Sequence, residues 1–141
     1  MVAGPNGAGK TTFVDNVLRR AAPRLETVFS HQSKVELVQA GVDAGYSVSL
    51  HVLIIPLEVA IARVAERVEH GGHDVPNDKM HERYARLWEL IAEAIGIATE
   101  SVVWDSSGFS SFTKVATFAG GRRIGDPRWP VWAPAPLVAL A

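Results

Sequence analysis

The chain has 141 residues, 48% of them hydrophobic, and a formal net charge of −1. This size and apolar content predict one globular domain over 1–141 with a sizeable core, and the near-neutral charge excludes a basic surface for nucleic acid or an anionic membrane. The absence of cysteine excludes disulfides and thiolate metal sites, and the lack of a membrane-length apolar stretch or a leader-like start predicts a cytoplasmic protein.

The first predicted element is a phosphate-binding loop, because residues 4–11 read G-P-N-G-A-G-K-T and match G-x-x-x-x-G-K-[ST]. In such a loop the lysine reaches the β- and γ-phosphates of a nucleotide and the following hydroxyl holds Mg²⁺. A glycine-rich turn before a helix is the plain alternative. The motif predicts ATP and Mg²⁺ as cofactors, Thr11 as a metal ligand, Lys10 as a catalytic residue, and nucleotide contacts from Gly4, Asn6, Gly7, Ala8, Gly9, Lys10, Thr11 and Thr12.

Only three residues precede this loop, so we expect a shortened first strand or a misassigned chain start. Helices and strands then alternate, which favours an α/β fold. The predicted fold is a three-layer P-loop NTPase-like domain with a reduced parallel sheet and a helical lid at about 63–90. In the first half of the chain we expect a helix from Phe13 to about Ala22, closed by Pro23; a strand over 25–29; a helix from a Ser33 cap to Gly45; and a strand over 46–55. A helix from Pro56 to about His70, a loop over 71–76 and a helix from Asn77 to about Gly96 follow. The chain is then expected to form a strand over 101–104 ending at Asp105, a hairpin of 112–118 with 122–124, and an extended Trp/Pro-rich tail over 127–141 held by its tryptophans.

Positive charge for phosphoryl transfer is expected from arginines on the two helices of the lid. Arg63 and Arg67 are four residues apart, and Arg83 and Arg86 are three apart, so each pair shares a helical face. The glycine-rich break between the helices would serve as a hinge. Solvated arginines that pair with neighbouring glutamates are the competing interpretation.

Asp105 ends an apolar strand, where an acid that helps hold Mg²⁺ is expected beside a phosphate loop. A loop-initiating aspartate is the equally good alternative. A second group of metal-type side chains does not have the H-x-x-x-H spacing of a helical metal site, so no metal is predicted there. That group is His70, His73, Asp74 and His81.

Three segments together resemble the zeta toxin family: 4–12, the E-T-V-F-S-H of 26–31, and the G-G-H-D-V-P of 71–76 followed by a basic helix with Lys79, Arg83, Tyr84 and Arg86. Members of that family are P-loop small-molecule kinases that use ATP to phosphorylate the 3′-hydroxyl of the sugar in UDP-N-acetylglucosamine. The resemblance implies a nucleotide-sugar substrate and an antitoxin protein as partner. It also implies substrate contacts at Glu26 and Thr27, catalytic lid arginines at Arg83 and Arg86 with Arg67 as a weaker candidate, and a lid loop shaped by His73 and Pro76.

One departure from the family pattern concerns the general base. The family places a strand with an Asn-Ala-Asp-like segment, and a helix, between its first helix and its Glu-Thr strand, whereas here only Pro23, Arg24 and Leu25 intervene. The missing aspartate is the family's candidate base, and its loss would cost about 10²- to 10⁴-fold in rate. Glu26 could replace it if the shortened pocket brought it to the acceptor hydroxyl.

Three functions therefore stay open: a zeta-like kinase, a catalytically impaired nucleotide-binding remnant, and a partner-binding protein controlled by an antitoxin-like chain. An ABC transporter ATPase also fits the loop motif. It does not fit the rest of the chain, which has no L-S-G-G-Q-like signature and no apolar strand ending in Asp-Glu.

Overall fold

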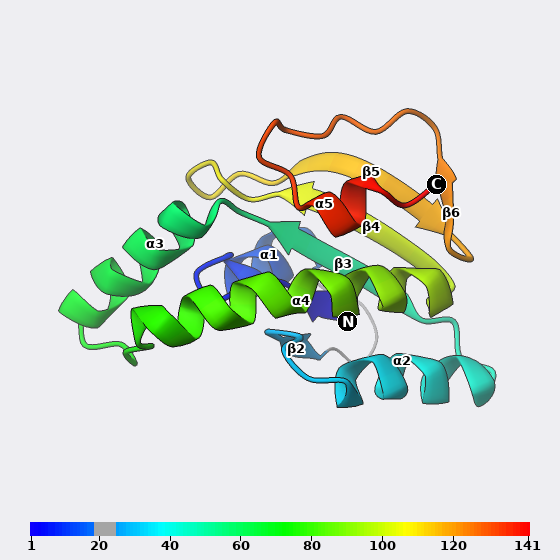
Figure 1. Ribbon diagram of the computed structural model, residues 1–141, viewed down its shortest axis with the longest axis horizontal. Coiled ribbons are helices and arrows are strands. Elements are labelled where there is room, and N and C mark those ends of the chain that lie inside the picture. The colour runs from blue at the N-terminus through cyan, green and yellow to red at the C-terminus, as the bar shows by residue number, and fades with distance from the viewer. Residues whose placement is uncertain (19–24) are drawn as a thin grey trace.

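The computed structural model describes residues 1–18 and 25–141, which form an α/β fold around a six-stranded mixed sheet (Figure 1). The strand order is β2-β1-β3-β4-β5-β6; the first four strands are parallel, and β5 and β6 are antiparallel. In chain order the elements are β1 (Val2–Ala3), α1 (Lys10–Phe13), the π-helical turn η1 (Val14–Leu18), β2 (Glu26–Thr27), α2 (Ser33–Asp43), β3 (Ser49–Ile54), α3 (Leu57–Glu69), α4 (Asn77–Ile97), β4 (Glu100–Asp105), β5 (Thr113–Ala119), β6 (Arg122–Ile124) and α5 (Ala135–Val138).

The sheet is the middle layer of three, as the alternation of side chains along β3 shows. Val52 and Ile54 join a core cluster with α2, α4 and α5, whereas Leu53 joins a second cluster with α1, η1 and α3. Figure 1 shows α4 in front of the sheet and α1 behind it. Because both faces are covered, β3 reads as an almost continuous apolar run, as the sequence predicted for a buried parallel strand.

The short first strand was correctly predicted, since β1 has two residues and pairs with both β2 and β3. β2 is shorter than the predicted strand over 25–29, because the backbone turns at Phe29, where φ is +60°. The predicted end of the first helix, at Ala22 and Pro23, lies outside the described residues.

Two predicted helix starts are wrong by one residue. Ser33 is the first helical residue of α2 and Gln32 occupies the cap position, while Pro56 caps α3 rather than opening it, because its ψ of 142° is extended. The predicted hairpin is confirmed as β5 and β6.

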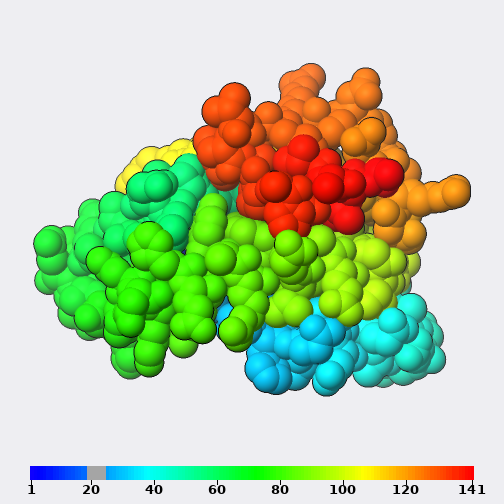
Figure 2. Space-filling model, in the orientation of Figure 1, coloured from blue at the N-terminus to red at the C-terminus, as the bar shows by residue number. Residues whose placement is uncertain are grey.

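The C-terminal tail is not extended throughout. Pro134 caps the short helix α5, and Leu137 from that helix is buried against the α4 side of the sheet. Trp129 and Trp132 pack on the same cluster, which confirms that the tryptophans hold this segment. Figure 2 shows the tail lying over α4.

The predicted helical lid is α3 together with the N-terminal part of α4, joined by a turn at Gly71 where φ is +85°. It is packed on the sheet: the Tyr84 hydroxyl donates to the Ile55 carbonyl oxygen (2.9 Å), and Met80 is buried beside α3. In the described part of the chain, no helix has both the length and the apolar character needed to cross a membrane.

Candidate functional site

The phosphate-loop motif forms the connection from β1 to α1, and its glycines are required by the backbone. Gly7 and Gly9 have φ near +80°, in the left-handed region that favours glycine. A Cβ atom on Gly7 would lie 2.6 Å from the carbonyl oxygen of Ala60 in α3. The loop and α3 can therefore approach this closely only with glycine at position 7.

Lys10 begins α1, and its side chain folds back over the loop. Its Nζ atom donates to the carbonyl oxygens of Gly4 (3.1 Å) and Pro5 (3.0 Å). The pKa of Lys10 is lowered to about 8, mainly because the ammonium group is buried; the negative charge of Glu26 opposes this shift, and the positive charge of Arg67 adds to it. An anion bound here would favour the charged lysine, because it would replace water as the partner of a desolvated ammonium group.

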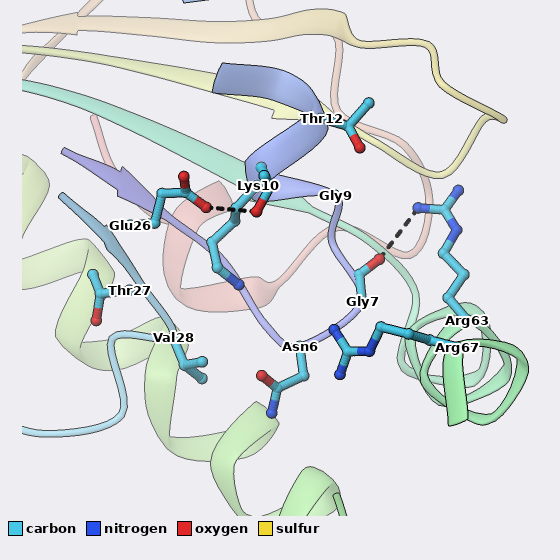
Figure 3. Close-up of a pocket in the computed structure, with 11 residues that line it drawn as sticks. Asn6, Gly7, Gly9, Lys10, Thr12, Glu26, Thr27, Val28, Arg63 and Arg67 are labelled. Atoms are coloured by element: carbon cyan, nitrogen blue, oxygen red, sulfur yellow. Dashed lines mark hydrogen bonds between the residues drawn. The ribbon is translucent and has the colours of Figure 1, made fainter. Parts of the chain in front are cut away.

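A cavity of about 530 Å³ opens beside Lys10. Figure 3 shows that its walls come from the phosphate loop, the strand β2 and the helix α3. The sequence predicted most of this lining, but it did not predict Val28. The lining residues are Asn6, Gly7, Gly9, Lys10, Thr11, Thr12, Glu26, Thr27, Val28, Arg63 and Arg67.

Arg63 connects α3 to two loops. Its guanidinium donates to the carbonyl oxygens of Ser106 (2.8 Å), Ser107 (3.1 Å) and Gly108 (2.8 Å), and at 3.4 Å to that of Gly7. It thereby ties the phosphate loop to the loop that follows β4. A second cavity of about 230 Å³ lies between those loops and shares Gly7, Gly9, Thr12 and Arg63 with the first.

Arg67, one turn further along α3, has a weaker attachment, a 3.4 Å hydrogen bond to the His73 carbonyl oxygen. Its positive charge lines the 530 Å³ cavity and lowers the pKa of Lys10. The pair on α3 therefore lies at the phosphate loop.

The structure does not bring Arg83 and Arg86 into this cavity. Both are exposed on α4 and line a separate hollow of about 220 Å³ with Ser30, Lys79 and Glu82. Arg86 forms an exposed ion pair with Glu82 (3.6 Å). Their catalytic role remains a prediction, and Arg63 and Arg67 are instead the arginines that line the cavity at the glycine-rich loop. The sequence offered no signal to separate the two pairs, since both have helical spacing.

Glu26 and Thr27 both line the 530 Å³ cavity, and their role as substrate contacts stays a prediction. In the parallel register Glu26 pairs with Val2, whose side chain faces α1, and the Thr11 hydroxyl donates to Glu26 Oε2 (2.9 Å). Thr27 pairs with Ala3, and its Oγ1 accepts a hydrogen bond from the Phe29 backbone N–H (3.1 Å). Of the described residues that line the large cavity, Glu26 alone carries a carboxylate.

Asp105 lines neither cavity at the loop, and its metal role stays a prediction that this placement does not favour. Its Oδ1 accepts a hydrogen bond from the Ser107 backbone N–H (2.8 Å), so it initiates the loop after β4. Residues 1–18 and 25–141 contain no group of three or more His, Cys, Asp or Glu side chains placed to hold a metal ion. A Mg²⁺ ion fits this chain only in the manner usual for Mg²⁺·nucleotide, with one or two protein oxygens, water and phosphate oxygens. Thr11 and Glu26 provide such oxygens.

No family model and no curated protein matches the chain. Among solved structures it is similar to a chain in the crystal structure of AvrRxo1-ORF1:AvrRxo1-ORF2 with sulphate ions, with a TM-score of 0.64 and 12% sequence identity. The match covers 87% of this chain but 59% of that chain, so this chain spans somewhat over half the length of its structural neighbour. At this identity the similarity supports the α/β fold.

Proposed function

We infer that the chain is an ATP-dependent phosphotransferase of the zeta-toxin type, which transfers the γ-phosphoryl group to a sugar hydroxyl of a small molecule such as UDP-N-acetylglucosamine. The observation that carries this inference is the placement of Lys10, Arg63 and Arg67 around one cavity of about 530 Å³ at a phosphate-loop motif with left-handed glycines. Phosphoryl transfer depends mainly on positioning and on positive charge around the phosphate, and this cavity provides both.

In the proposed reaction, the acceptor hydroxyl oxygen forms a bond to the γ-phosphorus. The bond from that phosphorus to the oxygen bridging to the β-phosphate breaks, ADP leaves, and the hydroxyl proton passes to solvent water. Lys10 would hold the β- and γ-phosphates, and Arg67, which lines the same cavity, would supply a second positive charge to the transferred group. Thr11 would help to hold Mg²⁺, which would supply charge neutralisation for the phosphates.

The segment from Thr27 to Ser30 supports an anionic acceptor. Thr27 and Val28 line the phosphate cavity, while Ser30 lines the basic hollow with Lys79, Arg83 and Arg86. A nucleotide sugar along this segment would place its diphosphate near the basic side chains of α4. Arg83 and Arg86 would then bind the acceptor rather than ATP.

The structural neighbour adds two supporting points. Its crystals contain sulphate, a tetrahedral oxyanion like phosphate, and it was solved as a complex of two different chains. A protein partner of the antitoxin kind therefore belongs to the proposal.

A nucleotide-binding protein without phosphotransfer is the second candidate. The observation that favours it is the engagement of Glu26 with Thr11, which leaves the cavity lining without a carboxylate free to act as a general base. The two candidates differ in turnover and not in ATP binding.

The test has two stages and uses Lys10→Ala with Lys114→Ala as the matched control, because Lys114 is exposed and lies outside the cavity. Thermal unfolding is measured with and without ATP·Mg²⁺; ligand at 100 times its Kd should stabilise the wild type and the control by about 2.7 kcal/mol, and Lys10→Ala hardly at all. Equal stabilisation of all three proteins would refute the nucleotide site. Phosphorus NMR with UDP-N-acetylglucosamine then separates the kinase, which forms a phosphorylated sugar and ADP, from the binding protein.

A further inference from the structure

The phosphate cavity contains a hydroxyl and a carboxylate that already contact each other. Thr11 Oγ1, at the start of α1, and Glu26 Oε2, on the edge strand β2, are 2.9 Å apart. Because the Thr11 hydroxyl donates its proton to Glu26, the lone pairs of Oγ1 remain free to point toward a bound ligand. A hydroxyl held in this way is oriented for a cation.

The short edge strand explains why the carboxylate is there. β2 pairs directly with β1, the strand that leads into the phosphate loop, and the Val2–Glu26 register turns Glu26 to the α1 face of the sheet. The next residue, Thr27, pairs with Ala3, which belongs to the cluster on the opposite face. A shift of one residue would therefore turn the carboxylate away from the α1 face, on which Thr11 lies.

The charges around the Glu26 carboxylate also suit a site that binds a metal ion together with phosphate. Glu26 shares the cavity with Lys10 and Arg67. An ATP molecule brings several negative charges, which would repel the nearby carboxylate of Glu26. A divalent cation between Glu26 and the phosphates removes that repulsion.

On the basis of the proposed function, we propose that Glu26, together with Thr11, forms the protein's share of the divalent-cation site for the bound nucleotide, the role predicted for Asp105. Mg²⁺ commonly takes one or two carboxylates, several waters and phosphate oxygens, so one carboxylate and one hydroxyl suffice. In this proposal Glu26 is a ligand of the metal ion and not the general base that removes the proton of the acceptor hydroxyl.

The test measures binding of ADP and ATP by calorimetry, once with Mg²⁺ and once with EDTA, for the wild type, Glu26→Gln and Asp105→Asn. We expect Mg²⁺ to tighten wild-type binding at least tenfold and to have less than a twofold effect on Glu26→Gln. In EDTA, Glu26→Gln should bind nucleotide as tightly as the wild type or more tightly, because a negative charge has been removed. Asp105→Asn should behave as the wild type.

A spectroscopic readout reports metal binding directly, separately from the nucleotide affinities that calorimetry measures. With ADP and Mn²⁺ held constant, the wild type and Asp105→Asn should deplete the electron paramagnetic resonance signal of free Mn²⁺ beyond the depletion caused by ADP alone, and Glu26→Gln should add no further depletion. Glu26 is exposed, so the substitution should not impair folding, which an unchanged Tm without ligand verifies.

The outcomes separate this proposal from the proposed function. If the wild type binds nucleotide in a Lys10-dependent way but Glu26→Gln keeps the full Mg²⁺ effect, the metal assignment is overturned and the nucleotide site stands. A Glu26→Gln protein that binds Mn²⁺·ADP normally but loses turnover would make Glu26 the general base. A wild type that binds no nucleotide in either medium overturns both.

Discussion

Two arginine pairs on neighbouring helices of the lid have nearly the same spacing, yet they face different parts of the molecule. Arg63 and Arg67 follow Ala60 at intervals of three and seven residues on α3, and Ala60 packs against Gly7 of the phosphate loop. Helical periodicity therefore turns both arginines toward the loop. On α4 the packing side is instead occupied by Met80 and Tyr84, so that Arg83 and Arg86 border a different hollow. The difference shows that the spacing of two arginines does not determine which part of the molecule they face. The buried residues on the same helix determine it, because they fix which side of the helix packs on the protein.

The largest expected effect within this comparison is that of Arg63→Ala. This change removes a charged donor from the carbonyl oxygens of Ser106, Ser107 and Gly108. Because the guanidinium is partly exposed, we expect a loss of about 2 kcal/mol in the free energy of unfolding rather than the sum of separate hydrogen bonds. Chemical denaturation measures this, with Arg83→Ala as the control of unchanged stability. Equal loss in both variants would contradict the distinction between the helices.

The second effect concerns the pH dependence of ATP binding. The pKa of Lys10 is lowered to about 8 in the free protein, so the lysine is charged below that pH and loses its proton above it. Phosphate favours the charged form, and affinity should therefore fall as the pH rises from 7 to 9, by about tenfold for one full unit above the pKa. Calorimetric titrations at several pH values should show this fall in the wild type and a flat, weak profile in Lys10→Met. A wild-type affinity that rises over this range would be incompatible with Lys10 as the phosphate ligand.

Arg67→Ala should lower the affinity for ATP about fivefold at low ionic strength and less at high salt, since its charge borders the cavity and is exposed to solvent screening. Its hydrogen bond to His73 is long (3.4 Å), so stability should change by less than about 0.5 kcal/mol. Fluorescence titration with a labelled nucleotide at two salt concentrations provides the measurement. If the ATP affinity of Arg67→Ala were unchanged, Arg63 would be the only one of these two α3 arginines that contributes to ATP binding.

The smallest effect on ATP binding is expected for Arg83→Ala and Arg86→Ala. The Glu82–Arg86 ion pair is exposed and 3.6 Å long, so its loss should cost no more than about 0.5 kcal/mol. ATP affinity should stay within twofold of the wild type, while the KM for a nucleotide-sugar acceptor rises. If ATP affinity fell as strongly as in Arg67→Ala, the α4 pair would close over the nucleotide as the family resemblance implies.

The two carboxylates at strand ends repeat the lesson of the arginine pairs. Asp105 ends a six-residue strand and was a good candidate for the metal, yet its Oδ1 is bound to the Ser107 N–H. Glu26 lies on a two-residue edge strand whose sequence did not indicate a metal ligand, and it contacts Thr11. Which strand neighbours β1 is a property of the sheet order, and no local pattern around either acid encodes that order.

The sequence by itself determined the glycine-rich loop before α1, the alternation of strands and helices, and the two-sided burial of β3. These features depend on local rules: glycine tolerates positive φ, apolar periodicity selects helix or strand, and a continuous apolar run indicates cover on both faces. Only the tertiary structure decided that Arg63, Arg67 and Glu26 meet Lys10 while Arg83, Arg86 and Asp105 do not. That choice depends on contacts between residues far apart in the chain, such as Ala60 with Gly7 and Val2 with Glu26, whose close packing selects one face of each element.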